Sequence, residues 1–168
     1  HMMNFLHQCE LKNFDLDYCV LRYGSLYGPG ATHGNAIYEI ITQALKNKKI
    51  EYWGTGEEIR QYIHVKDAAV GSVKILQSDF NEKYISLTGI EDIKVKNMLY
   101  MVNEILGGNI KIETSSDPKF MSHYMITPFN FMPKTGKKLI FATYKDLGQG
   151  ILECIHEVHS KLNENENE

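Results

Sequence analysis

Residues 17–23 (DYCVLRY), followed directly by a glycine-rich stretch, constrain the fold more than any other feature of the sequence. A run of mostly apolar, β-prone residues is typical of a strand that is buried on both faces of a parallel sheet. Residues 24–34 (GSLYGPGATHG) contain four glycines and a proline, so we expect a loop there. Asn35 can then cap a helix that runs to about Leu45. Strand, loop and helix in this order predict an α/β fold.

Strands and helices alternate along the rest of the chain as well. The patterns predict strands over residues 49–53, 58–65, 83–87 and 110–113, and helices over residues 67–77, 95–106 and 144–162. Asp67 is expected as the N-cap of its helix. Residues 114–144 have weak periodicity and several prolines, which predicts an irregular segment with at most one helical turn.

The two ends of the chain have patterns of their own. Residues 3–14 carry a helical apolar stripe without a capping residue, which is typical of the end of a longer helix. Residues 163–168 are expected to be a disordered tail. We interpret His1 and Met2, directly before Met3, as a cloning scar.

Composition and charge narrow the class of protein. At 168 residues the chain is long enough for one domain whose core needs neither disulfides nor metal. A formal net charge of −3 gives no electrostatic reason to expect a nucleic acid or an anionic membrane as partner. Three cysteines without CxxC spacing, and the lack of a signal peptide or a long apolar run, favour a cytoplasmic protein.

Three patterns resemble functional motifs but are better explained otherwise. Residues 28–34 have the spacing GxGxxxG without the context of a dinucleotide fingerprint, so we interpret them as a loop. Tyr62 and Lys66 have the Tyr-x-x-x-Lys spacing of a catalytic pair, but on a strand they are about 13 Å apart, too far for the ammonium to activate the phenol. Cys154 points away from the His156 and His159 pair on the last helix, so we expect no metal site.

The most informative polar residues lie on the strand expected over residues 58–65. Side chains alternate along a strand, so Arg60, Tyr62 and His64 should share one face. The arginine there offers a planar donor fork to a diphosphate, and the tyrosine offers a hydroxyl or a ring wall. The alternative is a surface strand whose arginine pairs with Glu57 or Glu58.

Two segments resemble the extended short-chain dehydrogenase/reductase family, which includes UDP-sugar 4-epimerases and sugar-nucleotide 4,6-dehydratases. Residues 21–30 (LRYGSLYGPG) are similar to the family's LRYxNVYGPG segment. Residues 53–56 (WGTG) and 60–69 (RQYIHVKDAA) are similar to its GxGxxxRDYIHVxDxA segment. The resemblance implies the C-terminal portion of a Rossmann-type fold: the last parallel strand or strands, followed by a small α/β substrate-binding domain.

The resemblance also implies how the chain is divided. Residues 3–30 would be the end of an NAD-binding Rossmann domain, and residues 31–162 a substrate-binding domain. The strand over residues 17–23 would normally pair with strands of the preceding half. Its unprotected edge therefore favours loose order or self-association into a homo-oligomer.

Functional residues are implied by position in the two segments and in the helix and strand between them. The nicotinamide end of NAD would face Tyr23, Gly24 and Leu26. A nucleotide-sugar of the UDP or dTDP type would contact Ser25, Asn35, Ala36, Glu51, Tyr52, Trp53, Arg60 and Tyr62. For Tyr52 and Trp53, simple core packing is the alternative.

The chain departs from the family's pattern at several positions. Ser25 and Gln61 replace the usual asparagine and aspartate. Residues 115–119 lack the family's second diphosphate arginine, and Lys119, Lys134 or Lys137 would have to replace it as point charges.

The family's chemistry sets an expectation for activity. NAD takes a hydride from the sugar while a lysine keeps a catalytic tyrosine ionised, and the motifs for both would precede Met3. We therefore expect a substrate-binding fragment of an NAD-dependent nucleotide-sugar epimerase or dehydratase, inactive alone and without tight NAD binding. The alternative is a non-catalytic nucleotide-sugar-binding or assembly module.

Overall fold

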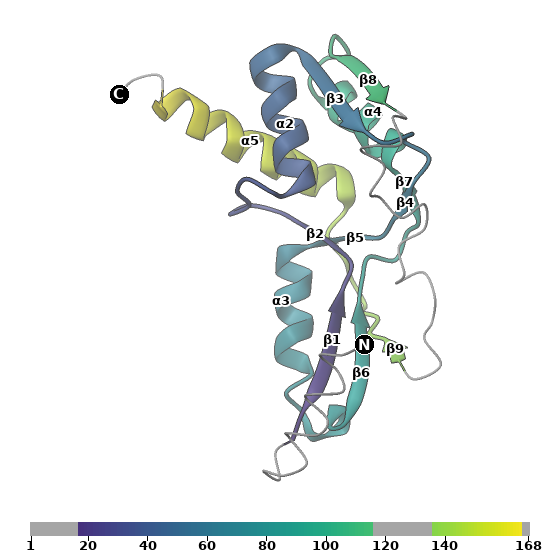
Figure 1. The fold of residues 1–168 in the computed structure, drawn as a ribbon. Coiled ribbons are helices and arrows are strands. Elements are labelled where there is room, and N and C mark those ends of the chain that lie inside the picture. Colours follow the sequence, from purple (N-terminus) through teal and green to yellow (C-terminus); the bar gives the residue numbers. More distant parts are fainter. Residues whose placement is uncertain (1–16, 116–135, 166–168) are drawn as a thin grey trace.

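The computed structural model describes residues 17–115 and 136–165, and strands and helices alternate through them (Figure 1). One sheet contains β1 (Cys19–Tyr23), β6 (Lys83–Leu87) and β9 (Gly136–Lys138), which are parallel and lie in the order β1–β6–β9. Helix α3 (Val65–Lys74) lies beside this sheet (Figure 1), with Ala68 packed among Leu21, Tyr23 and Leu87. The predicted α/β class with parallel strands is confirmed.

β1 forms where the sequence predicts it, but its environment differs from the expectation. It pairs with β6 residue by residue, from Cys19 with Lys83 to Tyr23 with Leu87. All five of its residues are half-buried, whereas we expected full burial on both faces. The reason is that β6 is the one strand paired with β1 among the residues described.

Two short strand pairs join this sheet to the rest of the molecule. β2 (Ser25–Tyr27) lies parallel to β5 (Tyr62–His64), and β4 (Ile59–Arg60) lies antiparallel to β7 (Ile93–Lys94). The loop expected over residues 24–34 is therefore wrong at Ser25–Tyr27.

The single strand expected over residues 58–65 is also wrong, because the chain leaves β4 and enters β5 at Gln61. The Gln61 carbonyl accepts from the Ser25 amide at 2.9 Å, and its side-chain amide donates to Asp92 at 2.8 Å. These contacts direct β4 and β5 to different partner strands.

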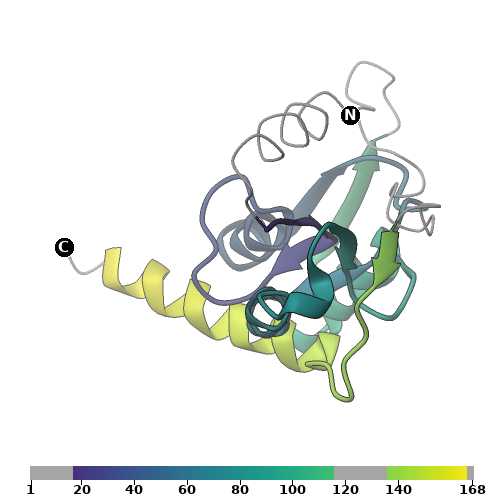
Figure 2. The ribbon, with the colours of Figure 1, turned by 90° about the horizontal axis from the view of Figure 1, so that it is seen from below.

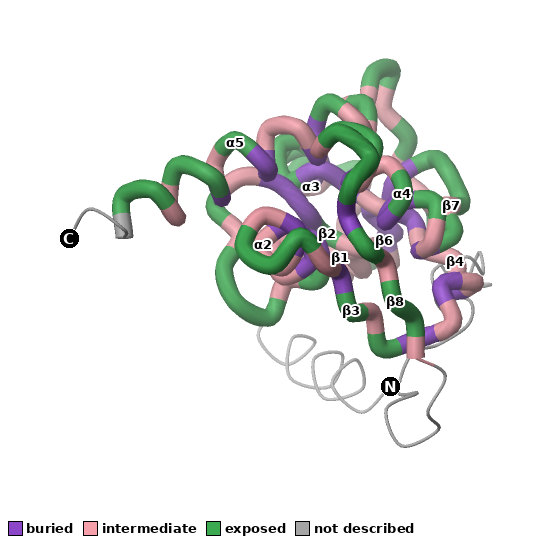
Figure 3. Tube along the Cα trace, turned by 90° about the horizontal axis from the view of Figure 1, so that it is seen from above, coloured by how far each residue is buried: buried purple, intermediate pink, exposed green. Residues whose placement is uncertain are grey.

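The larger hydrophobic core lies among α2 (Ala36–Asn47), β3 (Lys49–Trp53), α4 (Val95–Ile105), β8 (Lys111–Ser115) and α5 (Leu147–Asn165). β3 and β8 are parallel neighbours. As predicted, Asn35 is the N-cap of α2, and its side chain accepts from the Tyr38 amide at 3.2 Å. In Figure 3 many of the buried stretches lie in the centre of the molecule, and further buried stretches lie near β4.

Helix α3 begins two residues before the predicted start. Its N-cap is His64, whose Nδ1 accepts from the Lys66 amide at 3.3 Å. Asp67 was expected as the cap, and this was wrong: it lies in the first turn and accepts from the Lys145 amide at 2.9 Å. The segment that resembles the family motif, residues 60–69, thus contacts the C-terminal part of the chain. After α3, a short 3-10 turn at Ser78–Phe80 leads to β6.

Helix α5 extends away from the sheet toward the C-terminus (Figures 1 and 2). Ile151, Cys154, Ile155 and Val158 form its buried face, whereas His156 and His159 are exposed, as the spacing predicts. The helix continues to Asn165, beyond the expected end at Leu162. The predicted helix over residues 3–14 and residues 166–168 of the predicted tail lie outside the described residues. Among the described residues no helix combines the length and apolarity needed to cross a bilayer.

Candidate functional site

Most of the predicted substrate-binding residues line one cavity of about 140 Å³. Ile37, Ile40, Val95 and Met98 form its apolar part. The predicted residues in its wall are Ser25, Leu26, Asn35, Ala36, Tyr52, Arg60 and Tyr62. Residues that are far apart in the sequence therefore meet at one site.

Asn35 organises one side of this cavity. Its Nδ2 donates to the Leu26 carbonyl at 2.9 Å, while its Oδ1 caps α2. The asparagine thereby holds β2, at Leu26, and the first residue of the helix, Ala36, at the same wall. The backbone N–H groups of a first helical turn lack helical acceptors and carry partial positive charge, which favours an anion.

Arg60 and Tyr62 belong to two other strands, one to β4 and one to β5. Although Gln61 separates the two strands, both side chains line the same cavity. One guanidinium nitrogen of Arg60 donates to the Ile59 carbonyl at 2.8 Å, which fixes the orientation of the fork.

The glutamates proposed as alternative partners of Arg60 have other contacts. Glu57 forms ion pairs with Lys94 at 2.7 Å and with Lys96. Glu58 accepts from the amide of Thr55 at 2.8 Å and from its hydroxyl at 3.1 Å. The lysines hold the Glu57 carboxylate, whereas Thr55 holds only Oε1 of Glu58, and the buried Oε2 of Glu58 has no hydrogen-bond partner among the described residues.

Tyr62 lacks the environment of an ionised catalytic tyrosine. It lies on β5 while Lys66 lies on α3, so the two do not share a helix, in line with the sequence interpretation. Burial raises the pKa of the Tyr62 phenol, and the charge of Glu58 contributes in the same direction. The phenol is therefore protonated near neutral pH and serves as a wall and a hydrogen-bonding group.

A second cavity, of about 230 Å³, adjoins the first at Tyr52, which lines both. Its walls are Glu51, Tyr52 and Trp53 of β3 and Glu113, Thr114 and Ser115 of β8. Trp53 is 49% exposed, so core packing does not account for this side chain. The indole is accessible to a stacking partner.

The carboxylates beside this second cavity are paired with lysines. Lys49 contacts Glu51 at 2.5 Å and Glu113 at 2.8 Å, and Lys111 contacts Glu113 at 2.7 Å. Hydrogen bonds from Lys111 and Lys49 lower the pKa of Glu113 to about 2. These pairs leave little net negative charge to repel an anionic ligand.

Of the residues expected near the nicotinamide, Leu26 alone lines either of these two cavities. Leu26 is 40% exposed. The Tyr23 hydroxyl instead lies 2.6 Å from the Ser72 hydroxyl of α3. Gly24 is closely packed, because a Cβ there would lie 2.6 Å from the Gln61 carbonyl oxygen.

The sequence interpretation missed part of both cavities. Val95 and Met98 lie on the buried stripe of α4, and the periodicity of that helix could have indicated them. Residues 113–115 could not be found, because no local signal shows that β8 pairs with β3. Of the lysines expected to replace a second arginine, Lys137 is exposed on β9, while Lys119 and Lys134 lie outside the described residues.

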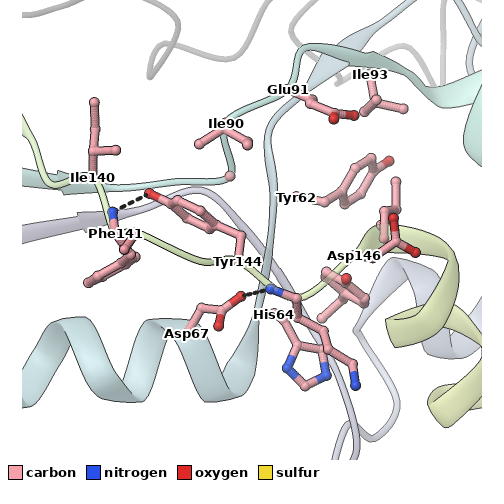
Figure 4. A pocket seen from close by; sticks show the side chains of 15 residues that line it. Tyr62, His64, Asp67, Ile90, Glu91, Ile93, Ile140, Phe141, Tyr144 and Asp146 are labelled. Atoms are coloured by element: carbon pink, nitrogen blue, oxygen red, sulfur yellow. Dashed lines mark hydrogen bonds between the residues drawn. The ribbon is translucent and has the colours of Figure 1, made fainter.

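A larger cavity, of about 370 Å³, includes one of the predicted residues, Tyr62 (Figure 4). Two of its carboxylates bind backbone groups: Asp67 accepts from the Lys145 amide, and Asp146 accepts from the Gln149 amide at 2.9 Å. Figure 4 shows Tyr144 beside Phe141 within the same segment, with its hydroxyl near the Phe141 amide. Because these polar groups hold the turn into α5, we interpret this cavity as a structural junction.

Comparison with known proteins places these features in a family. A family model described as "NAD dependent epimerase/dehydratase family" matches residues 3–86. A dTDP-4-dehydro-6-deoxy-D-allose reductase of Streptomyces bikiniensis is 29% identical over 108 residues, which cover 61% of this chain and 32% of the reductase. A UDP-glucuronate 4-epimerase of Thermodesulfobacterium geofontis is 26% identical over 101 residues, 60% of this chain and 31% of the epimerase.

Solved structures show the same fold. UDP-glucuronic acid 4-epimerase from Bacillus cereus, in complex with UDP-glucuronic acid and NAD, superposes with a TM-score of 0.75 at 19% identity. The match covers 94% of this chain and 50% of that protein. The epimerase Mth375 from Methanothermobacter thermautotrophicus gives a TM-score of 0.76 at 14% identity, covering 94% of this chain and 48% of that one. The fold is thus the Rossmann-type fold of these epimerases, and the chain belongs to the NAD-dependent epimerase/dehydratase family.

Proposed function

We propose that this chain is the substrate-binding part of an NAD-dependent nucleotide-sugar epimerase or dehydratase. The observation that carries the proposal is the convergence of Arg60, the N-terminus of α2 and the aromatic pair Tyr52 and Trp53 on two adjoining cavities. Cationic and N–H donors beside the exposed Trp53 ring and the half-buried Tyr52 ring match a ligand with a diphosphate and a base.

The two cavities suggest how such a ligand lies. The diphosphate lies between the Arg60 guanidinium and the first turn of α2. The base extends past Tyr52 toward Trp53, and the sugar lies near Ser25 and the Tyr62 ring. Serine is shorter than asparagine, so its contact with the sugar runs through a water molecule.

In this proposal, NAD binds to the full-length protein of which this chain is a part. Residues 3–30 are assigned to the end of the cofactor domain and residues 31–162 to the substrate domain, although β6 and β9 share one sheet with β1. Leu26, whose side chain is accessible, fits a contact with the nicotinamide end, whereas the Tyr23 hydroxyl is engaged by Ser72. When bound, NAD supplies the hydride acceptor.

Binding of UDP and dTDP to the chain tests the proposal, with uridine and inorganic phosphate as reference ligands in calorimetric titrations. Arg60→Ala should weaken UDP binding about tenfold to a hundredfold, because hydrogen bonds to a charged group contribute about 1.5–3 kcal/mol. Arg60→Lys should recover part of this loss, since the charge remains but the fork is lost.

Lys74→Ala is the matched control, because Lys74 is an exposed cation on α3 that lines neither cavity. The affinity of the Lys74→Ala variant for UDP should equal that of the wild type. A wild-type chain that does not bind UDP or dTDP, or an Arg60→Ala variant that binds them equally well, would overturn the proposal.

The proposal also makes the chain catalytically incomplete. With NAD and UDP-sugars, rigorously purified chain should show no epimerisation, because the cofactor domain and an activated Tyr–Lys pair are both required. Turnover above the background of a mock preparation would show that the chain is more than the substrate-binding part.

The proposal further includes that the chain associates with copies of itself and that it is located in the cytoplasm. β1 is half-buried, and β6 is the one strand paired with it within residues 17–115 and 136–165. An open strand edge favours pairing with another chain. Light scattering over a range of concentrations should therefore show dimers or larger species. A strict monomer with strongly protected amides in β1 would contradict this part.

A further inference from the structure

The glycine-rich loop between β2 and α2 determines where Asn35 and Ala36 lie in the candidate site. Gly28, Gly30 and Gly34 have φ values of 140°, 89° and 93°, in the region that glycine tolerates and other residues rarely adopt. Residues 32–34, which lead into the Asn35 cap of α2, are exposed. Since glycines gain the most conformational freedom when a loop opens, this loop needs contacts from outside to remain ordered.

Glu157 of α5 supplies such a contact. The Gly30 amide donates to both of its carboxylate oxygens, at 3.0 Å to Oε1 and 2.8 Å to Oε2. Lys161, one turn further on, pairs with the same carboxylate at 2.6 Å, and its ammonium lies 5.9 Å from the ring centre of Tyr38. Hydrogen bonding by Lys161 lowers the pKa of Glu157, so the carboxylate is ionised when it accepts from Gly30.

Further contacts bring the same loop against α5. The backbone of Gly28 forms a hydrogen bond with the thiol of Cys154, which belongs to the buried face that anchors the helix. At the far end of the loop, the Gly34 amide donates to Glu39 of α2 at 3.2 Å. The loop is therefore held by carboxylates on two helices, and the one on α5 acts at its centre.

We propose that Glu157 is a positioning residue for the candidate site: it orders the glycine-rich loop and thereby holds Asn35 and the first turn of α2 where they bind the diphosphate. This inference rests on the proposed function. Glu157 touches no ligand in this proposal, and its effect on binding passes through the backbone of Gly30 to the helix N-terminus. A charge-assisted bond to backbone is strong enough for such a role.

The test compares variants of the full 168-residue chain, with UDP as the ligand and exchange of the Gly30 amide as an independent readout. Glu157→Ala removes both acceptors, so the Gly30 amide should exchange faster and UDP affinity should fall about tenfold. Glu157→Gln keeps one acceptor oxygen, and it should restore most of the affinity and part of the amide protection.

Two control variants separate positioning from general stability. Ile155→Val truncates a buried residue of the same helix and should lower the melting temperature without changing UDP affinity. Glu164→Ala removes an exposed carboxylate of α5 and should change neither quantity.

Two results would overturn the inference: Gly30 exchange that is unchanged in Glu157→Ala, or a loss of affinity that Ile155→Val reproduces at equal loss of stability. A wild-type chain that does not bind UDP would overturn the proposed function instead. Gly30 exchange in Glu157→Ala would then still decide whether the carboxylate orders the loop.

Discussion

His64 Nε2 lies 3.4 Å from Glu153 Oε2 across the contact between β5 and α5, and the imidazole is fully buried. Because Nδ1 of the same ring accepts from the Lys66 amide, the neutral ring carries its proton on Nε2, which faces the carboxylate. Lys145 pairs with Glu153 at 2.5 Å on its other oxygen. The contact joins the C-terminal helix to the strand that carries Tyr62.

Stability should therefore depend on pH through His64. Burial lowers the pKa of His64 below its ordinary value of 6.5, although the charges of Glu153 and Asp67 act in the opposite direction. With a lower pKa in the folded state, the unfolded chain binds the proton first as the pH falls. The free energy of unfolding should therefore decrease as the pH falls below about 6.5, before the carboxylates titrate.

Urea unfolding at about pH 7.5 and about pH 5.5 checks this dependence. His64→Gln should be less stable than the wild type at the higher pH but should lose less on acidification. His156→Gln, which changes an exposed histidine of α5, should follow the wild type. Equal acid sensitivity of the wild type and His64→Gln would contradict the assignment.

Gly89 should tolerate no side chain. A Cβ at this position would lie 2.0 Å from the Tyr62 carbonyl oxygen, and a backbone atom cannot move aside as a side chain can. We expect Gly89→Ala to destabilise the chain by about 2–4 kcal/mol in urea unfolding and to weaken UDP binding, because β5 must shift. Retention of wild-type stability would show that the loop after β6 adapts freely.

Gly148→Ala provides the matched control for this substitution. In α5 the nearest atom to its added Cβ is a side-chain oxygen of Asp146 at 3.3 Å. Alanine is favoured over glycine in a helix by up to about 1 kcal/mol, so this variant should be neutral or slightly more stable.

The sequence predicted correctly those strands whose ends are marked by neighbouring residues. The strands at Lys49–Trp53 and Lys83–Leu87 have the predicted bounds, because turn residues and a capped helix border them. The break at Gln61 could not be predicted, since it depends on contacts with Ser25 and Asp92. Asp67 was misassigned for the same reason: its acceptor role depends on Lys145.

In the candidate site too, some features could be predicted from the sequence, whereas others depend on contacts between distant residues. The family resemblance predicted that Arg60, Tyr62 and Asn35 belong to one site, and the three line one cavity. Such a resemblance retains information about tertiary contacts that periodicity lacks. The motif position of Tyr23 did not show that its hydroxyl is bound by Ser72. Glu157 could not be inferred at all, because its link to Gly30 exists through packing of α5 against the loop.

Trp53 is the single tryptophan of the chain and should report ligand binding directly. Since its indole is half exposed beside the second cavity, iodide should quench its fluorescence in the free chain, and UDP should reduce that quenching. Trp53→Phe should bind UDP more weakly by a few fold, with little change in stability, because base stacking contributes about 1–3 kcal/mol. Tyr100→Phe, at an exposed site on α4, is the control and should bind normally. Unchanged quenching in the presence of saturating UDP would exclude Trp53 from the base site.

Adjacent glutamates in the turn before β4 should differ sharply in their effect on stability. Glu58 is 1% exposed and accepts from both the amide and the hydroxyl of Thr55. Although burial acts to raise its pKa, backbone hydrogen bonds outweigh this effect and lower it, so the buried carboxylate stays ionised. Removing it leaves both the amide and the hydroxyl of Thr55 without their acceptor. Glu58→Ala should therefore cost about 2–3 kcal/mol in urea unfolding.

Glu57 provides the internal comparison for that measurement. Its carboxylate is exposed and pairs with Lys94 and Lys96, and such exposed pairs contribute little to stability. Glu57→Ala should therefore unfold close to the wild type. Glu58→Gln should lie between the two variants, because it keeps an acceptor for Thr55 but loses the charge. If Glu57→Ala and Glu58→Ala proved equally stable, the turn would be held by the chain on either side of it and not by the buried carboxylate.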